Sequence, residues 1–384
     1  MFMLMLATQL ALMAQPDVYG PAPVARSAKR LAYDAELGGK AQDEAIEAWL
    51  TANPNAPPSQ RALLWHRLCN DYGVRVGGLR RVRACARSVE LTGDSEDKSD
   101  LAIAKAFAAV PPTTATGRAT VALLPNPLGS LGVAVTVRGV TLPWIVDTGA
   151  EITTLPQSTA SRIGVRMVDG VADVGSSVGS VKGKLGVIEA ATIGGVTIRN
   201  IQVLILPDAM LRLSKDYGIP GILGLPALAA IGRIAWLDGG TRLALGRDAP
   251  APSGVVDRVY WHEAGLGIPL RTAVGLAGAQ FDSGADRTAL RQPGLALLTA
   301  PQIASAAEHD GMVGGAGGFV RVKQRVLPEL RYTLAGVALT SSKVPIEDNT
   351  DSAGRIGSDI LPQLKLLSID FVTMTLMAEP TELH

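Results

Sequence analysis

The chain has 384 residues, of which 36 are basic and 35 acidic, giving a formal net charge of +1. This balance provides no overall field that would favour nucleic acid or an anionic membrane surface, so we expect neither as a partner. A substrate must therefore be recognised by its shape and backbone. The length allows two or three domains of ordinary size.

An apolar run opens the chain. Residues 1–14 end in the small residue Ala14 and are typical of the hydrophobic region of a signal peptide. The run is too short to span a bilayer, and no later apolar run is long enough to anchor the chain. No Lys or Arg precedes it, so the alternatives are that the true start lies further upstream or that these residues form a buried or disordered chain end. We therefore predict that residues 1–14 are a signal peptide and that the protein is periplasmic or secreted. We expect no membrane span.

Residues 15–116 are expected to form a small helical N-terminal domain and a linker. Between residues 42 and 109, apolar residues recur at the three-to-four spacing of amphipathic helices. The only two cysteines of the chain, Cys69 and Cys85, fall on consecutive predicted helices. In an oxidising compartment they could form one disulfide, and two buried free thiols are the alternative.

The pattern changes after this region. Short Val, Ile and Leu runs alternate with turn residues in a chain that has 42 glycines and 24 prolines, which predicts a mainly β structure. The stretch 111–117 has the composition of a linker, and residues 248–254 form a second such stretch. We therefore expect one lobe over residues 117–249 and another over residues 250–384.

These two predicted lobes contain the same motif. Residues 147–150 read Asp-Thr-Gly-Ala and residues 282–285 read Asp-Ser-Gly-Ala, each after an apolar strand. A second glycine, Gly224 or Gly357, follows each aspartate at nearly the same separation. Such order indicates an internal duplication. A carboxylate is costly to desolvate unless hydrogen bonds or function compensate, so two of them in matching places suggest one shared site.

At these residues the chain resembles the aspartic proteases, both retropepsin-like and pepsin-like, over residues 118–380. Ala150 and Ala285 make each lobe resemble a retropepsin, whereas the fused duplication resembles a pepsin in organisation. The nearest match is a bacterial two-lobed protease. The resemblance implies a mainly β fold with two retropepsin-like or pepsin-like β-barrel lobes in tandem behind the helical domain. Arg355 departs from the pattern, which has an apolar residue there, and leaves the packing beneath Asp282 open.

The resemblance assigns Asp147 and Asp282 as a catalytic dyad of an aspartic endopeptidase. Two adjacent carboxyl groups share one proton, so one acts as base toward a water molecule and the other as acid, without a metal or cofactor. The proton belongs to the pair, and the sequence assigns it to neither aspartate. Support for the dyad is expected from the hydroxyls and turn glycines that follow the aspartates: Thr148, Gly149, Ser283 and Gly284.

Each predicted lobe also contains a glycine-rich hairpin that could close over an extended peptide or protein substrate. The candidate flap residues are Gly175, Ser176, Ser177 and Gly179 in the first, and Gly314, Gly315 and Gly317 in the second. Two surface hairpins without a role are the alternative. Because both half-sites lie in one chain, a monomer is expected.

The sequence is also compatible with other functions. A catalytically silent peptide-binding protein with the same two-lobed cleft is the main alternative. A solvated helix face is the default explanation for the arginines around Cys85. The helical domain also resembles the basic pro-segments that cover the cleft of pepsin-like zymogens, and this resemblance implies that it could inhibit the enzyme, act as a chaperone or dock substrate. Residues 175–179 also fit the Gly-x-Ser-x-Gly pattern of serine hydrolases, without the helix that should follow it. The four histidines lack ligand spacing, so no metal site is expected.

Overall fold

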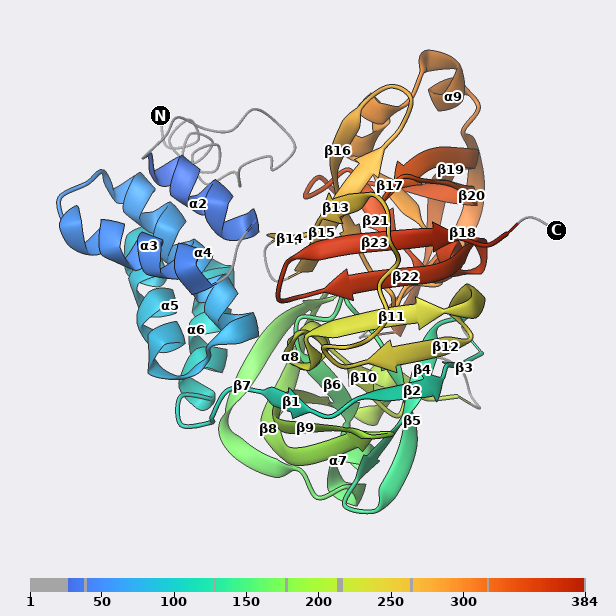
Figure 1. Cartoon of the computed structure of the whole chain (residues 1–384). Helices are drawn as coiled ribbons and strands as arrows, with labels where there is room; N and C mark the ends of the chain where they lie inside the picture. Colours follow the sequence, from blue (N-terminus) through green and yellow to red (C-terminus); the bar gives the residue numbers. More distant parts are fainter. Residues whose placement is uncertain are drawn as a thin grey trace.

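A computed structural model describes residues 27–37, 40–127, 129–176, 179–212, 217–262, 265–315 and 318–382. The predicted signal peptide lies outside these residues. A group of helices stands beside a mainly β body with two large sheets, and a smaller sheet lies between them (Figure 1). The expectation of a mainly β chain with N-terminal helices is confirmed.

The N-terminal helices form a compact group around their own apolar core. They are α2 (Ala28–Leu37), α3 (Lys40–Ala52), α4 (Pro58–Arg75), α5 (Gly78–Thr92) and α6 (Ser95–Ala106). Cys69 on α4 and Cys85 on α5 are joined by a disulfide, with their Cα atoms 4.7 Å apart, and both are fully buried in this core. The disulfide therefore fixes the central pair of helices.

The first large sheet contains nine strands. In sheet order its main path is β1 (Thr114–Thr116), β9 (Val196–Leu206), β6 (Thr153–Pro156), β10 (Ile222–Leu223), β5 (Val140–Val146), β4 (Leu131–Val137), β8 (Gly179–Ile193) and β7 (Arg166–Ser176), while β3 (Leu124–Pro125) pairs with β4. An additional pairing joins β8 to β9. The segment assigned to a linker is thus partly a strand, because β1 finds a pairing partner in β9 that is distant in sequence.

The second large sheet repeats much of this order. Its path is β14 (Tyr260–His262), β15 (Gly265–Arg271), β16 (Leu276–Phe281), β21 (Gly354–Ile356), β17 (Ala289–Arg291), β20 (Val337–Glu347), β19 (Gly318–Leu334) and β18 (Ala307–Gly315), with an additional pairing of β15 with β19.

Short helices connect the strands of the β body. They are α7 (Gln157–Arg162), α8 (Leu225–Ile231) and α9 (Ala300–Ala304), and the 3-10 turns are η1 (Asp208–Leu211), η2 (Asp238–Gly240), η3 (Gln292–Leu297) and η4 (Ser358–Gln363).

A third, six-stranded sheet joins the two halves. Its order is β13 (Val256–Arg258), β23 (Thr375–Pro380), β22 (Leu364–Asp370), β11 (Arg233–Leu237), β12 (Arg242–Leu245) and β2 (Ala119–Ala122). We call it the shared sheet, because β11 from the first half pairs antiparallel with β22 from the second. Trp236 on β11 packs edge-on against Phe281, with ring centroids 5.5 Å apart. The shared sheet therefore supports the strand that leads into Asp282.

The helices dock onto both halves of the β body. Ile103 and Phe107, at the end of the helical group, share an apolar cluster with Ile222 of the first sheet. On the other side, the Arg67 Nη1 donates a 2.9 Å hydrogen bond to the Trp261 carbonyl of β14, and the buried Arg67 guanidinium is paired with Asp71. Among the described residues, no helix is both long and apolar enough to cross a membrane.

Candidate active site

The two aspartates occupy equivalent positions at the ends of two strands. Asp147 follows β5 and its N–H donates to the Leu223 carbonyl at 3.1 Å, whereas Asp282 follows β16 and its N–H donates to the Ile356 carbonyl at 3.0 Å. In each case the accepting residue belongs to a short parallel neighbour, β10 beside β5 and β21 beside β16. The repeated sequence motif thus lies at two matching strand ends.

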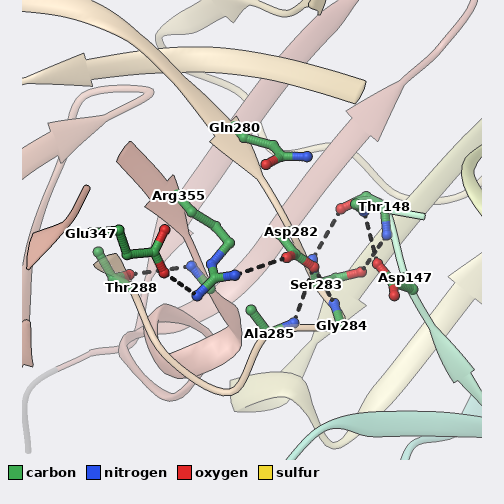
Figure 2. A network of polar contacts seen from close by, with 12 residues as sticks. Asp147, Thr148, Gln280, Asp282, Ser283, Gly284, Ala285, Thr288, Glu347 and Arg355 are labelled. Atoms are coloured by element: carbon green, nitrogen blue, oxygen red, sulfur yellow. Dashed lines mark hydrogen bonds and ion pairs between the residues drawn. The ribbon is translucent and has the colours of Figure 1, made fainter. Parts of the chain in front are cut away.

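The structure brings these strand ends together through their glycine turns (Figure 2). A Cβ atom placed on Gly149 would lie 2.6 Å from the Asp282 Cγ, and one placed on Gly284 would lie 2.4 Å from the Asp147 Cγ. Both separations are far shorter than a van der Waals contact. Each glycine turn therefore lies against the opposite carboxyl group, and only a residue without a side chain fits there.

The hydroxyls of Thr148 and Ser283 link the two halves directly beneath the carboxyl groups. The Thr148 hydroxyl donates to the Phe281 carbonyl at 2.7 Å and accepts the Ser283 N–H at 3.0 Å. Reciprocally, the Ser283 hydroxyl donates to the Val146 carbonyl at 2.8 Å and accepts the Thr148 N–H at 3.2 Å. Both side chains are buried. This exchange fixes the two strand ends relative to each other.

Replacing Thr148 with valine is expected to lower the free energy of unfolding by about 1–3 kcal/mol, because the buried Ser283 N–H and the Phe281 carbonyl each lose their hydroxyl partner. Thr148→Ser keeps the hydroxyl and serves as the control. Urea unfolding followed by circular dichroism measures both variants. Equal stability of Thr148→Val and the native chain would contradict the linking role of this hydroxyl.

The carboxylates are held by backbone N–H groups. The Gly149 N–H donates to the Asp147 Oδ1 at 2.8 Å, and the N–H groups of Gly284 and Ala285 donate to the Asp282 Oδ1 at 3.0 and 3.1 Å. Desolvation, reinforced by the negative charge of Asp282, raises the pKa of Asp147 well above its ordinary value. A carboxyl group with a raised pKa, beside a second carboxyl group, is suited to acid–base catalysis.

Arg355 is part of this site, although the sequence indicated only a departure from a pattern. Its Nη1 lies 3.8 Å from the Asp282 Oδ2, and its Nη2 donates to the Glu347 Oε1 at 2.9 Å. Figure 2 shows the guanidinium between these two carboxylates. Arg355 is thus accommodated beside Asp282 by an ion pair, because Glu347 at the end of strand β20 supplies the partner that an apolar residue would not need.

The glycine-rich segments are tips of long hairpins. Gly175 pairs with Ser180 and Ser176 with Gly179 at the end of β7 and β8, whereas Gly314 and Gly315 end β18 opposite β19. The candidate residues Ser177 and Gly317 lie outside the described residues. In the part of the chain that the structure describes, neither tip joins the hydrogen-bond network of the aspartates, so the flap function remains a prediction.

The described residues contain no group of three or more His, Cys, Asp or Glu side chains placed to hold a metal ion. Residues 133–227 match the family model for aspartyl proteases. This segment includes Asp147, Gly149 and Gly224, and the match supports an aspartyl protease function for the chain. No curated protein sequence matches the chain.

Proposed function

We propose that this chain is an aspartic endopeptidase whose catalytic dyad, Asp147 and Asp282, forms between two duplicated lobes, residues 117–249 and 250–384. The observation that carries the proposal is the reciprocal packing of each glycine turn against the opposite carboxyl group. We further propose that each lobe is a retropepsin-like barrel, for which the additional pairings of β8 with β9 and of β15 with β19 are the support.

In this proposal the dyad carries one proton and holds a water molecule. The ionised carboxylate takes a proton from the water as its oxygen attacks the peptide carbonyl carbon, and the protonated carboxyl group gives its proton to the carbonyl oxygen. The resulting tetrahedral diol then releases the amine, which takes up the proton of the first carboxyl group, while a diol hydroxyl returns a proton to the second. The peptide bond is hydrolysed and the dyad returns to its starting state.

The proposed substrate is a peptide or protein segment in extended form, covered by the β7–β8 and β18–β19 hairpins. Both half-sites lie in one chain, so we propose a monomer that needs no second copy for catalysis.

We also propose a periplasmic or secreted location. The Cys69–Cys85 disulfide supports it, because such bonds persist in oxidising compartments.

The test of this function is hydrolysis of a mixed peptide library between about pH 3 and pH 8, followed by mass spectrometry. The full chain should release fragments with new ends inside the peptides. Peptide binding without hydrolysis at any pH in this range would instead support a catalytically silent binding protein. Measuring binding by fluorescence anisotropy on the same peptides separates the two outcomes.

The pH dependence of hydrolysis should reflect the burial of Asp147, the charge of Asp282 and the lack of a hydroxyl on Ala150. Because the pKa of Asp147 is raised, its proton is retained at higher pH, and the alkaline limb of the rate profile should extend toward neutrality. Ala150→Ser would add a hydroxyl able to stabilise the ionised carboxylate and should move that limb to lower pH by roughly 0.5–1 unit. A native profile that peaks below about pH 3 would contradict this account.

A further inference from the structure

The two halves of the candidate site differ in charge at a matched pair of positions on β10 and β21. Ile222 on β10 lies beside Ile145 on β5, in parallel register, and Arg355 on β21 lies beside Gln280 on β16 in the same way. The residue after each of them, Leu223 or Ile356, accepts the N–H of the adjacent aspartate. The duplicated framework is therefore nearly symmetric, but an apolar side chain in one half is replaced by a cation in the other.

This cation is fixed in place beside one aspartate. Its side chain is 20% exposed, its Nη2 is bound to Glu347, and its Nη1 faces Asp282 at 3.8 Å. Burial by itself disfavours the charged guanidinium, but the Asp282 and Glu347 carboxylates raise the pKa of Arg355 above its ordinary value. The arginine is thus a permanent positive charge at the dyad.

The other charged groups around Asp282 do not cancel the positive charge that Arg355 places beside it. Asp147 lies across the dyad, and Asp286, in the same loop, is exposed and paired with Arg287. Behind Arg355, the Glu347 carboxylate is shared with Arg291 of β17, whose Nε lies 3.3 Å from it. Arg291 is also paired with Asp351 at 2.7 Å. Of these cations, Arg355 is the one in contact with a dyad carboxylate.

We propose that Arg355 is a positioning residue that breaks the symmetry of the dyad, so that Asp282 carries the negative charge and Asp147 carries the shared proton. This inference rests on the proposed endopeptidase function. It assigns the roles that the pair alone leaves open: Asp282 takes the proton from the water, and Asp147 protonates the carbonyl oxygen. The raised pKa of Asp147, whose half contains Ile222 where the other has Arg355, agrees with this assignment.

The first experiment measures kcat/KM against pH for Arg355→Ile, which installs the residue found at the matched position 222, and for Arg355→Gln. Loss of the cation should destabilise the negative charge of the dyad, so the acidic limb should move upward by roughly 0.5–1 pH unit, with a smaller movement of the alkaline limb. Arg355→Lys should restore most of the acidic limb. Arg291→Gln removes one positive charge from the same cluster but keeps the contact between Arg355 and Asp282, so it should move that limb less than the Arg355 variants do.

A second experiment does not depend on activity. At a pH where the dyad holds one proton, Asp147→Asn replaces a neutral group with a neutral one, whereas Asp282→Asn removes the anion that faces Arg355. The unfolding temperature of Asp282→Asn should therefore be lower than that of Asp147→Asn by roughly 2 °C or more. The difference should shrink when both substitutions are repeated in the Arg355→Ile chain.

The outcomes separate the two proposals. If the native chain cleaves peptides but the Arg355 variants lose the same factor in rate at every pH, the positioning role is wrong and the endopeptidase function stands. The same conclusion follows if Asp282→Asn does not unfold at a lower temperature than Asp147→Asn. If the native chain does not cleave peptides at all, the proposed function fails first. A displaced acidic limb together with a lower unfolding temperature for Asp282→Asn than for Asp147→Asn supports both proposals.

Discussion

Asp147→Asn and Asp282→Asn should each reduce peptide hydrolysis by at least about 1,000-fold, because either substitution removes a proton-transfer partner that the other cannot replace. An amide has nearly the shape of a carboxyl group, so the glycine turns that contact each side chain should still fit. Initial rates on a single good substrate, measured at the native pH optimum, give the comparison.

The double variant provides the control for a shared site. Residues that act as one unit give losses that do not add, so Asp147→Asn combined with Asp282→Asn should be about as inactive as either single variant. Circular dichroism establishes that all three are folded. If one of the two single variants keeps more than about a tenth of the native rate, the aspartates do not work as a pair.

Gly149→Ala and Gly284→Ala should reduce kcat/KM by roughly 100-fold, since displacing a catalytic group by about 1 Å is enough to cause such a loss. The new methyl group would need to lie 2.6 Å from the Asp282 Cγ or 2.4 Å from the Asp147 Cγ, so the carboxyl groups must move apart. Steady-state kinetics on the same substrate measures the effect.

Gly275→Ala is the matched control for these two substitutions. A Cβ atom at Gly275 would meet its nearest neighbour, the Leu297 Cδ2, at an ordinary 3.5 Å, and the position is far along the hairpin from the aspartates. Its kcat/KM should remain close to the native value. Full activity of Gly149→Ala and Gly284→Ala would show that the turns tolerate a side chain and that the close packing of the two halves is not required.

The local elements of the fold could be predicted from the sequence because their signals are local. Three-to-four spacing predicted the helices that carry Cys69 and Cys85, and apolar runs broken by turn residues predicted a mainly β remainder. The segment 111–117 was the local exception: its linker composition gave no sign of β1, which forms through pairing with the distant β9. Strand pairing depends on a partner that composition does not reveal.

The candidate site, too, could be predicted from the sequence only where its signals are local. The repeated Asp-Thr-Gly-Ala and Asp-Ser-Gly-Ala motifs identified the candidate aspartates, the hydroxyls and the turn glycines, because each motif is a short continuous stretch. Arg355 stood out only as a departure, since its partner Glu347 lies on another strand and its distance from Asp282 depends on how β21 and β16 pair. No spacing rule connects these three residues.

The sequence by itself determined the two half-site motifs, the mainly β character and the helical start of the chain, each of which follows from residues a few positions apart. Only the tertiary structure decided how the halves meet: through the shared sheet, through hydroxyls that cross between Thr148 and Ser283, and through glycine turns packed against opposite carboxyl groups. The physical reason is that these contacts join residues more than a hundred positions apart, and their geometry is fixed by the packing of whole sheets.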